Sequence, residues 1–236
     1  MGKNESYYIQ ALNEAYLSHS LVVFYGAGLS KPFGLPEWKE LIEHLEDYFG
    51  GEEYTRSKEL EEKLSKNEFW LAISLLQEEL NVSAESIKNQ IGKVIREYED
   101  MNCNAPMSLP CLDNNYSDLA KLDISLFITT NFDRILSRYM PGIETTDFLN
   151  HGQALKDRFD QHTKQIIHLH GTATDPQSII ISKKDVAKIY RDRFWKTGFE
   201  TAANINTILF IGVSFSDLYL KNKITVRMKM LQKYAM

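Results

Sequence analysis

The chain has 236 residues, of which 43% are hydrophobic and 25% are charged, and its formal net charge is −5 at pH 7. This composition is ordinary for a soluble globular protein, and the acidic balance does not indicate nucleic-acid binding. No apolar run approaches the ~20 residues of a membrane span. The two cysteines, Cys103 and Cys111, form no CxxC pair, so we expect neither a disulfide framework nor a four-cysteine zinc site. A cytoplasmic, reducing location is the simplest interpretation.

The first quarter of the chain predicts a helix, a buried strand and a second helix. Apolar residues at helical spacing predict a helix over residues 5–19. The continuous apolar run at 21–25 predicts a strand that is buried on both faces. The glycine turn at 26–30 (GAGLS) follows directly, and the next helix is expected to begin near Glu37 and to stop at Gly50-Gly51.

Residues 52–98 have helical character throughout, and residues 99–114 are rich in loop-forming types. We predict a helical insertion over 52–115, between the first two sheet strands of a single domain that covers 1–236. Its apolar positions exceed what one sheet face would cover, which predicts homo-oligomer or regulatory-partner contacts. The alternative is a self-contained helical bundle. These apolar positions are Trp70, Ile73, Leu76, Leu80, Ile87, Ile91, Val94 and Ile95.

The second half of the chain returns to strands. Short apolar runs without polar alternation are typical of parallel sheets that are buried on both faces. They predict strands at 124–128, 166–169, 179–181 and 208–211, with a further short strand near Ile143. Helices are expected over 182–190 and 192–203. The fold class that follows is α/β, with a mostly parallel sheet.

Four short polar segments each follow an apolar run. They are residues 26–30 (GAGLS), 129–133 (TTNFD), 168–171 (HLHG) and 212–217 (GVSFSD). Ligands of open parallel sheets bind beyond the carboxyl ends of the strands, where all four segments would meet. The sequence therefore predicts a nucleotide site that is assembled from distant parts of the chain.

Each segment has a functional and a structural interpretation. The glycine turn brings backbone close to a phosphate, or it is only a tight turn. Asn131 would hold a ribose hydroxyl or a water and Asp133 would accept from an amide, or both cap a helix. His170 is the better general base of the two histidines, although strand-end histidines are often structural. Residues 212–217 form a second cradle, a strand-to-helix turn, or both.

The order GAGxS, TxNxD, HG and GxS resembles the sirtuin-like NAD-binding family, and more closely its bacterial anti-phage NAD-hydrolase branch than the protein deacylases. The resemblance covers roughly residues 21–217, leaves the insertion uncovered, and implies a Rossmann-like sheet with NAD bound as substrate and no metal. It implies pyrophosphate binding by Gly26, Ala27, Gly28 and Ser30, and contacts to the adenosine half by Gly212 and Ser214. It assigns the ribose and nicotinamide pocket to Asn131 and Asp133, with Asn131 and the base His170 as the catalytic residues.

The chain departs from the deacylases at several places. Deacylases carry Gln-Asn where this chain has Thr130-Asn131, a different sequence at residues 34–39, and a four-cysteine zinc module that this chain lacks. We therefore expect an NAD hydrolase that yields nicotinamide and an ADP-ribose product, as a toxic effector in abortive anti-phage defence. An NAD-dependent deacylase and a non-catalytic NAD or ADP-ribose sensor are the alternatives. The family's sheet continues past the GxS turn, so the end at Met236 predicts a truncated sheet.

Overall fold

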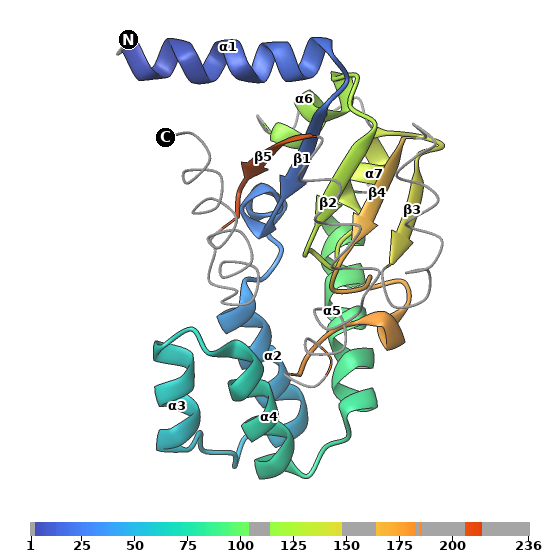
Figure 1. Cartoon of the computed structure of the whole chain (residues 1–236). Helices are drawn as coiled ribbons and strands as arrows, with labels where there is room; N and C mark the ends of the chain where they lie inside the picture. The colour runs from blue at the N-terminus through green and yellow to red at the C-terminus, as the bar shows by residue number, and fades with distance from the viewer. Residues whose placement is uncertain (1–2, 104–113, 148–163, 183–184, 186–205, 214–236) are drawn as a thin grey trace.

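The computed structural model describes residues 3–103, 114–147, 164–182, 185 and 206–213 (Figure 1). Within them, five strands form one sheet in the order β3-β4-β2-β1-β5, and every pairing is parallel. The strands are β1 (Leu21–Tyr25), β2 (Leu126–Thr129), β3 (Glu144–Asp147), β4 (Gln165–His168) and β5 (Thr207–Ile211). The predicted α/β, Rossmann-like parallel sheet is confirmed.

The apolar runs form the middle of this sheet because both of their faces are covered. Every residue of β1, β2 and β4 is buried. β3 has the sequence ETTD and only Thr146 of it is buried, as expected of a strand at an edge. The strand near Ile143 is confirmed, with its start one residue later.

The predicted strand at 179–181 is wrong. The three isoleucines there are completely buried, but they pair with no strand of the sheet in the described residues. Gly171 has a φ of +84° and the 3₁₀ turn η3 (Pro176–Ser178) follows, so the chain folds back onto the end of β4. There the N–H of Ile180 donates to the carbonyl of His170, 3.0 Å away. An apolar run indicates that a segment is buried but does not show that it is a strand, and this segment is buried as irregular chain.

Seven α-helices lie in the described residues. They are α1 (Lys3–Leu17), α2 (Trp38–Gly50), α3 (Lys58–Ser65), α4 (Phe69–Leu80), α5 (Ala84–Cys103), α6 (Asn115–Lys121) and α7 (Ile135–Tyr139). The first two confirm the predicted helices at 5–19 and from Glu37 to Gly50. Glu37 and Glu40 form a reciprocal capping box at the start of α2. The helices predicted over 182–190 and 192–203 fall mostly outside the described residues.

The region from 52 to 115 contains three helices where the sequence indicated one helical stretch. Ser57 caps α3 by accepting from the N–H of Leu60, and Asn81, with a φ of +50°, ends α4. α5 extends to Cys103, into the segment predicted as a loop, and α6 was not predicted at all. Helices α2 to α6 all lie between β1 and β2 in the chain. That 52–115 is an insertion within one domain stays a prediction.

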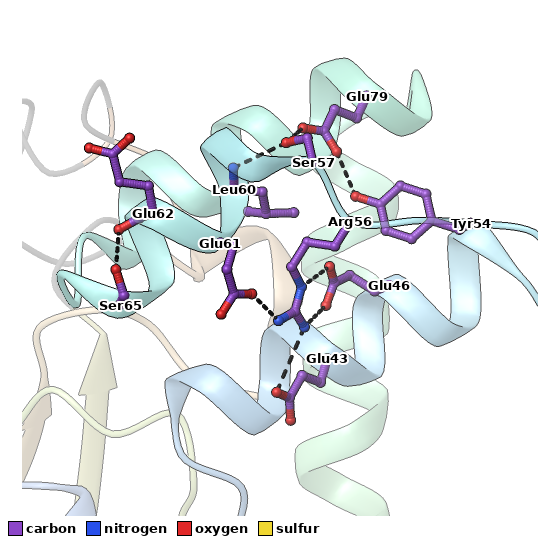
Figure 2. Close-up of polar contacts among 10 residues, drawn as sticks. All are labelled: Glu43, Glu46, Tyr54, Arg56, Ser57, Leu60, Glu61, Glu62, Ser65 and Glu79. Atoms are coloured by element: carbon purple, nitrogen blue, oxygen red, sulfur yellow. Dashed lines mark hydrogen bonds and ion pairs between the residues drawn. The ribbon is translucent and has the colours of Figure 1, made fainter.

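A loop with a dense set of polar contacts joins α2, α3 and α4 (Figure 2). Arg56 donates to both carboxylate oxygens of Glu46, at 2.8 and 2.5 Å, and to Glu61 at 2.7 Å. The hydroxyls of Tyr54 and Ser57 both donate to Glu79 of α4. The loop therefore ties the three helices to one another.

The apolar side chains of this region are covered within the chain. Ile73, Leu76, Ile87, Ile91, Val94 and Ile95 are buried, while Trp70 and Leu80 are half-buried. The surplus apolar surface from which partner contacts were predicted is therefore not found, and the self-contained bundle describes these residues better. Large apolar side chains are exposed on α1 instead, at Tyr7, Tyr8, Ile9 and Leu17. Across the described residues, the helices lack the combination of length and apolarity that a membrane crossing needs.

Helices α2, α4 and α5 lie beyond the carboxyl ends of the strands. In Figure 1 the strand arrows point toward α2, α4 and α5, and α1 lies beyond the opposite ends of the strands. The carboxyl ends of β1, β2, β4 and β5, which carry the four polar segments, thus face the helical region.

Candidate functional site

Three glycines bring the first and last polar segments into backbone contact. The N–H of Gly26 donates to the carbonyl of Ile211 and that of Gly28 to the carbonyl of Gly212, both at 3.0 Å. A Cβ on Gly26 would lie 2.7 Å from the Gly212 oxygen, and one on Gly28 would lie 2.9 Å from the Gly212 Cα. The sequence prediction that these segments meet is confirmed, and the close approach explains the need for glycine.

The same contacts change what the turn can offer to a phosphate. The N–H groups of Gly26 and Gly28 are already used, and those of Leu29 and Ser30 donate to carbonyls within the turn. In the described part of the chain, the N–H of the exposed Ala27 has no backbone acceptor. Pyrophosphate binding by this turn stays a prediction, with Ala27 as its main backbone donor.

Ser30 is the centre of a buried group of polar side chains. Its hydroxyl donates to Oδ2 of Asp133 at 2.7 Å and lies 2.8 Å from the hydroxyl of Tyr116. The Nδ2 of Asn131 donates to Ser30 at 3.0 Å and to Tyr116 at 3.4 Å. All four side chains are buried. The structure thus brings together Ser30, Asn131 and Asp133, three residues that the sequence singled out, and adds Tyr116.

The hydrogen bonds fix the direction of each proton in this group. A hydroxyl has one hydrogen, and Ser30 gives its hydrogen to the Asp133 carboxylate. Tyr116 must therefore donate to Ser30 across their 2.8 Å contact. Since Nδ2 of Asn131 points to Ser30 and Tyr116, its Oδ1 is left as an acceptor.

Asp133 has the capping role that the sequence left open, and its carboxyl is also strongly buried. Its Oδ1 accepts from the N–H of Ile135 at the start of α7, so it does cap a helix. Burial raises the pKa of its carboxyl to about 6, with a further increase from the negative charge of Glu99, while the hydrogen bonds from Ser30, Ile135 and Asn131 lower it. Titration this close to neutrality is common at functional sites, although structural networks produce it too.

The backbone of Asn131 is held by two residues to which the sequence assigned no role. Its N–H donates to Oγ1 of Thr129, whose hydroxyl donates to the carbonyl of Tyr25. Its carbonyl lies 2.9 Å from Nδ1 of His168. Burial lowers the pKa of His168 to about 4, so its ring is neutral at pH 7. A carbonyl can only accept, so the proton of this ring is on Nδ1.

His170 lies just beyond β4 and is buried against the helical region. Its ring meets the ring of Trp70 of α4 edge-on, with centroids 5.4 Å apart. Trp70 in turn contacts Trp38, at 4.9 Å, and Trp38 contacts Phe132, at 5.4 Å. A chain of aromatic rings therefore connects His170 to the segment that carries Asn131 and Asp133. The family resemblance does not cover α4, so the motifs could not indicate Trp70.

Two further predictions concern Ser214 and a metal ion. Ser214 lies outside the described residues, so its adenosine contact stays a prediction, as do the roles of the other site residues. Within the described ranges, no group of three or more His, Cys, Asp or Glu side chains is arranged to hold a metal ion.

Comparison with known proteins agrees with the motifs and the fold. A family model described as a SIR2-like domain matches residues 125–233. The chain is 28% identical over 218 residues to the NAD(+) hydrolase ThsA of Acinetobacter baumannii (strain 532279), covering 84% of this chain and 37% of that protein. It is 23% identical over 215 residues to the NAD(+) hydrolase ThsA of Bacillus cereus (strain MSX-D12), covering 89% of this chain and 40% of that protein.

The chain thus spans about two fifths of the length of these curated relatives. Their similarity extends over most of this chain, and the SIR2-like match includes β2, β4 and β5 with the polar segments that follow them. Together with the parallel sheet and the order of those segments, these matches show that residues 125–233 resemble a SIR2-like domain.

Proposed function

We propose that this protein cleaves the nicotinamide–ribose bond of NAD, giving nicotinamide and an ADP-ribose product. The observation that carries the proposal is the buried group of Ser30, Asn131 and Asp133, which gathers at the carboxyl ends of β1 and β2 beside the glycine contact. The similarity to proteins named NAD(+) hydrolases supports it. A role as a toxic effector of anti-phage defence in the bacterial cytoplasm belongs to the same proposal.

Cleavage requires the site to orient the nicotinamide and to stabilise its departure. Loss of neutral nicotinamide leaves an oxocarbenium-like ribose. With a pKa of about 6, Asp133 is mostly ionised at pH 7, and its carboxylate can accept from the carboxamide N–H of the nicotinamide. Ser30 now occupies Oδ2 of Asp133, so NAD binding would exchange this hydrogen bond for one to the substrate.

Water attack completes the reaction. Oδ1 of Asn131 is an acceptor that can hold a water or a ribose hydroxyl. His170 would take the proton from the attacking water or from that hydroxyl. General base catalysis of this kind contributes ~10²–10⁴-fold, and the remainder would come from positioning.

The test is nicotinamide release by the purified chain and by the variants Asn131→Ala and His170→Ala. Release should fall by ~10²–10⁴-fold in His170→Ala and also fall in Asn131→Ala. Asn13→Ala on the exposed face of α1 is the matched control and should keep the wild-type rate. Equal rates in all four proteins would reject the assignment.

A second candidate is a sensor that binds NAD or ADP-ribose without turnover. The observation that favours it is the closed set of hydrogen bonds in which Ser30, Asn131 and Asp133 satisfy one another. Saturable binding of NAD without nicotinamide release, in the same preparations, would establish the sensor.

An active NAD hydrolase would deplete the NAD of its own cell, so the proposal includes control by self-association or by a regulatory partner. The exposed apolar residues of α1, among them Tyr7, Tyr8 and Leu17, are the surface that the structure offers for such contacts. Light scattering of the chain with and without Tyr8→Lys tests this part.

A further inference from the structure

Helix α5 holds the chain directly after Asp133. Glu99 of α5 is buried, and its Oε1 accepts from the N–H of Arg134 at 2.8 Å. Its Oε2 accepts from the guanidinium of Arg138, at 3.0 Å. The carboxylate therefore fixes both the first residue after Asp133 and the helix α7 that begins there.

One turn earlier, the same helix holds the segment that follows His170. The guanidinium of Arg96 donates to the carbonyl of Ala173. Gly92 lets this segment lie on the helix, because a Cβ there would be 2.8 Å from Cγ of Pro176. Lys88 also reaches the carbonyl of Gln177, at 3.4 Å.

The two segments are joined to each other as well as to the helix. The N–H of Ala173 donates to the carbonyl of Phe132 at 2.9 Å. Phe132 lies between Asn131 and Asp133, and Ala173 lies three residues after His170. The helix and the two segments thus form a closed triangle of hydrogen bonds at the carboxyl ends of β2 and β4.

We propose that Arg96 and Glu99 are positioning residues that set the separation between Asn131 and His170. This inference rests on the proposed NAD-cleaving function. Both residues act through the backbone of the segments that carry the candidate reacting groups. Misplacement of reacting groups by about 1 Å can cost about 10²-fold in rate. Loss of either contact to α5 should therefore lower kcat far more than it raises KM.

Substitution of Glu99 can be followed through the pKa of Asp133, which a purely structural role of Glu99 would not change. Its charge raises the pKa of Asp133. The charge of Asp133 in turn raises the pKa values of the phenols of Tyr25 and Tyr116. Both phenols are neutral at pH 7, since burial raises their pKa values. Glu99→Gln keeps an acceptor for the Arg134 N–H but removes the charge, so the pKa of Asp133 should fall below about 6.

The helix offers matched controls. Lys93 and Glu97 form an exposed ion pair, 3.8 Å apart, on the same helix. The comparison is therefore Glu99→Gln with Glu97→Gln, and Arg96→Met with Lys93→Met, in the full chain. Arg96→Lys keeps a donor for the Ala173 carbonyl and should rescue part of the loss.

The variants are compared by steady-state nicotinamide release over pH 5–8 and by hydrogen exchange at the amides of the two segments. We expect kcat to fall by about 10- to 100-fold in Arg96→Met, with the controls at the wild-type rate. In Glu99→Gln the acid limb of the pH profile should move to lower pH. Each substitution should also speed exchange in the segment that the replaced side chain does not touch.

The outcomes separate this inference from the proposed function. An active wild type, with Glu99→Gln and Arg96→Met as active as their controls, overturns the positioning role alone. A wild type that releases no nicotinamide overturns the proposed function. In that case unchanged exchange rates would also overturn the claim that α5 holds the two segments in place, and faster exchange in both segments would support that claim.

Discussion

The hydroxyl of Ser30 donates to Asp133 across 2.7 Å, although the two residues are 103 positions apart in the chain. Ser30 is the last residue of the glycine turn after β1, and Asp133 lies shortly after β2. The parallel pairing of these strands, with Tyr25 opposite Thr129, brings both segments to the same edge of the sheet. The hydrogen bond therefore reports directly on whether the two polar segments are in place.

Ser30→Ala should destabilise the protein and disturb Asp133. The substitution removes the acceptor of Asn131 and Tyr116 and the donor to Asp133, so buried polar groups lose their partners. We expect the free energy of unfolding to fall by about 1–3 kcal/mol and the pKa of Asp133 to rise above about 6. Urea unfolding and a carboxyl NMR titration measure the two effects. Ser65→Ala, at an exposed position, is the control, and an equal loss there would contradict the prediction.

Asp133→Asn should change how stability depends on pH. The pKa of Asp133 is about 6 in the folded protein and 3.8 in the unfolded chain, so the folded state binds more protons between these values. The contribution of this group to the free energy of unfolding therefore decreases as pH rises from 3.8 to 6, by about 3 kcal/mol in total. The difference in stability between variant and wild type, measured by urea unfolding, should move in favour of Asn over this interval. A constant difference would refute the shifted pKa.

His168→Asn should have the opposite pH signature. The pKa of His168 is about 4 when folded and 6.5 when unfolded, so the unfolded chain binds more protons between these values. Its contribution to stability is complete above pH 6.5 and is lost as pH falls to 4, by about 3 kcal/mol. Asn can still donate to the Asn131 carbonyl but does not titrate. Relative to wild type, the variant should gain stability as pH falls through this range, and parallel pH profiles would count against a buried neutral ring.

Arg56→Ala should loosen the junction of α2, α3 and α4. Glu46 is 6% exposed and receives two hydrogen bonds from Arg56, so the substitution leaves a largely buried carboxylate without them. Because Arg56 itself is partly exposed, we expect a loss of about 1–3 kcal/mol, less than for a fully buried pair. Thermal unfolding of Arg56→Ala is compared with that of Lys121→Ala, whose ion pair with Asp118 is exposed. A similar melting temperature for both variants would show that the network contributes little.

The sequence predicted those parts of the fold that depend on local pattern. The run at 21–25 is apolar at every position because both faces of β1 are covered. The apolar run at 208–211 also forms a strand, although its residues are only half-buried. The run at 179–181 is equally apolar but is buried as irregular chain. An apolar run alone does not distinguish a buried strand from buried irregular chain. The meeting of Gly26 and Gly28 with Gly212 was predicted because both segments follow strands of a parallel sheet.

The candidate site was predicted only where its residues belong to a recognisable motif. Tyr116 lies in a polar stretch with no periodicity, and only the folded structure shows that α6 places its hydroxyl beside Ser30. Trp70 belongs to the apolar stripe of a helix, where most aromatic residues only fill a core. Arg96 looks like an ordinary charged helix position, and Glu99 begins the stretch that was predicted as a loop. Their contacts to Arg134 and Ala173 depend on tertiary packing that no local pattern contains.

The contact between the glycine turn and the end of β5 also limits which second substitutions could compensate for a substitution in the turn. At Gly28 the atoms that a new methyl group would meet are Cα and the carbonyl of Gly212, so the obstacle is backbone. Position 212 has no side chain to shorten, and its φ of +63° disfavours any other residue there. A selection for second-site suppressors of Gly28→Ala should therefore return true revertants, with no compensating change at position 212.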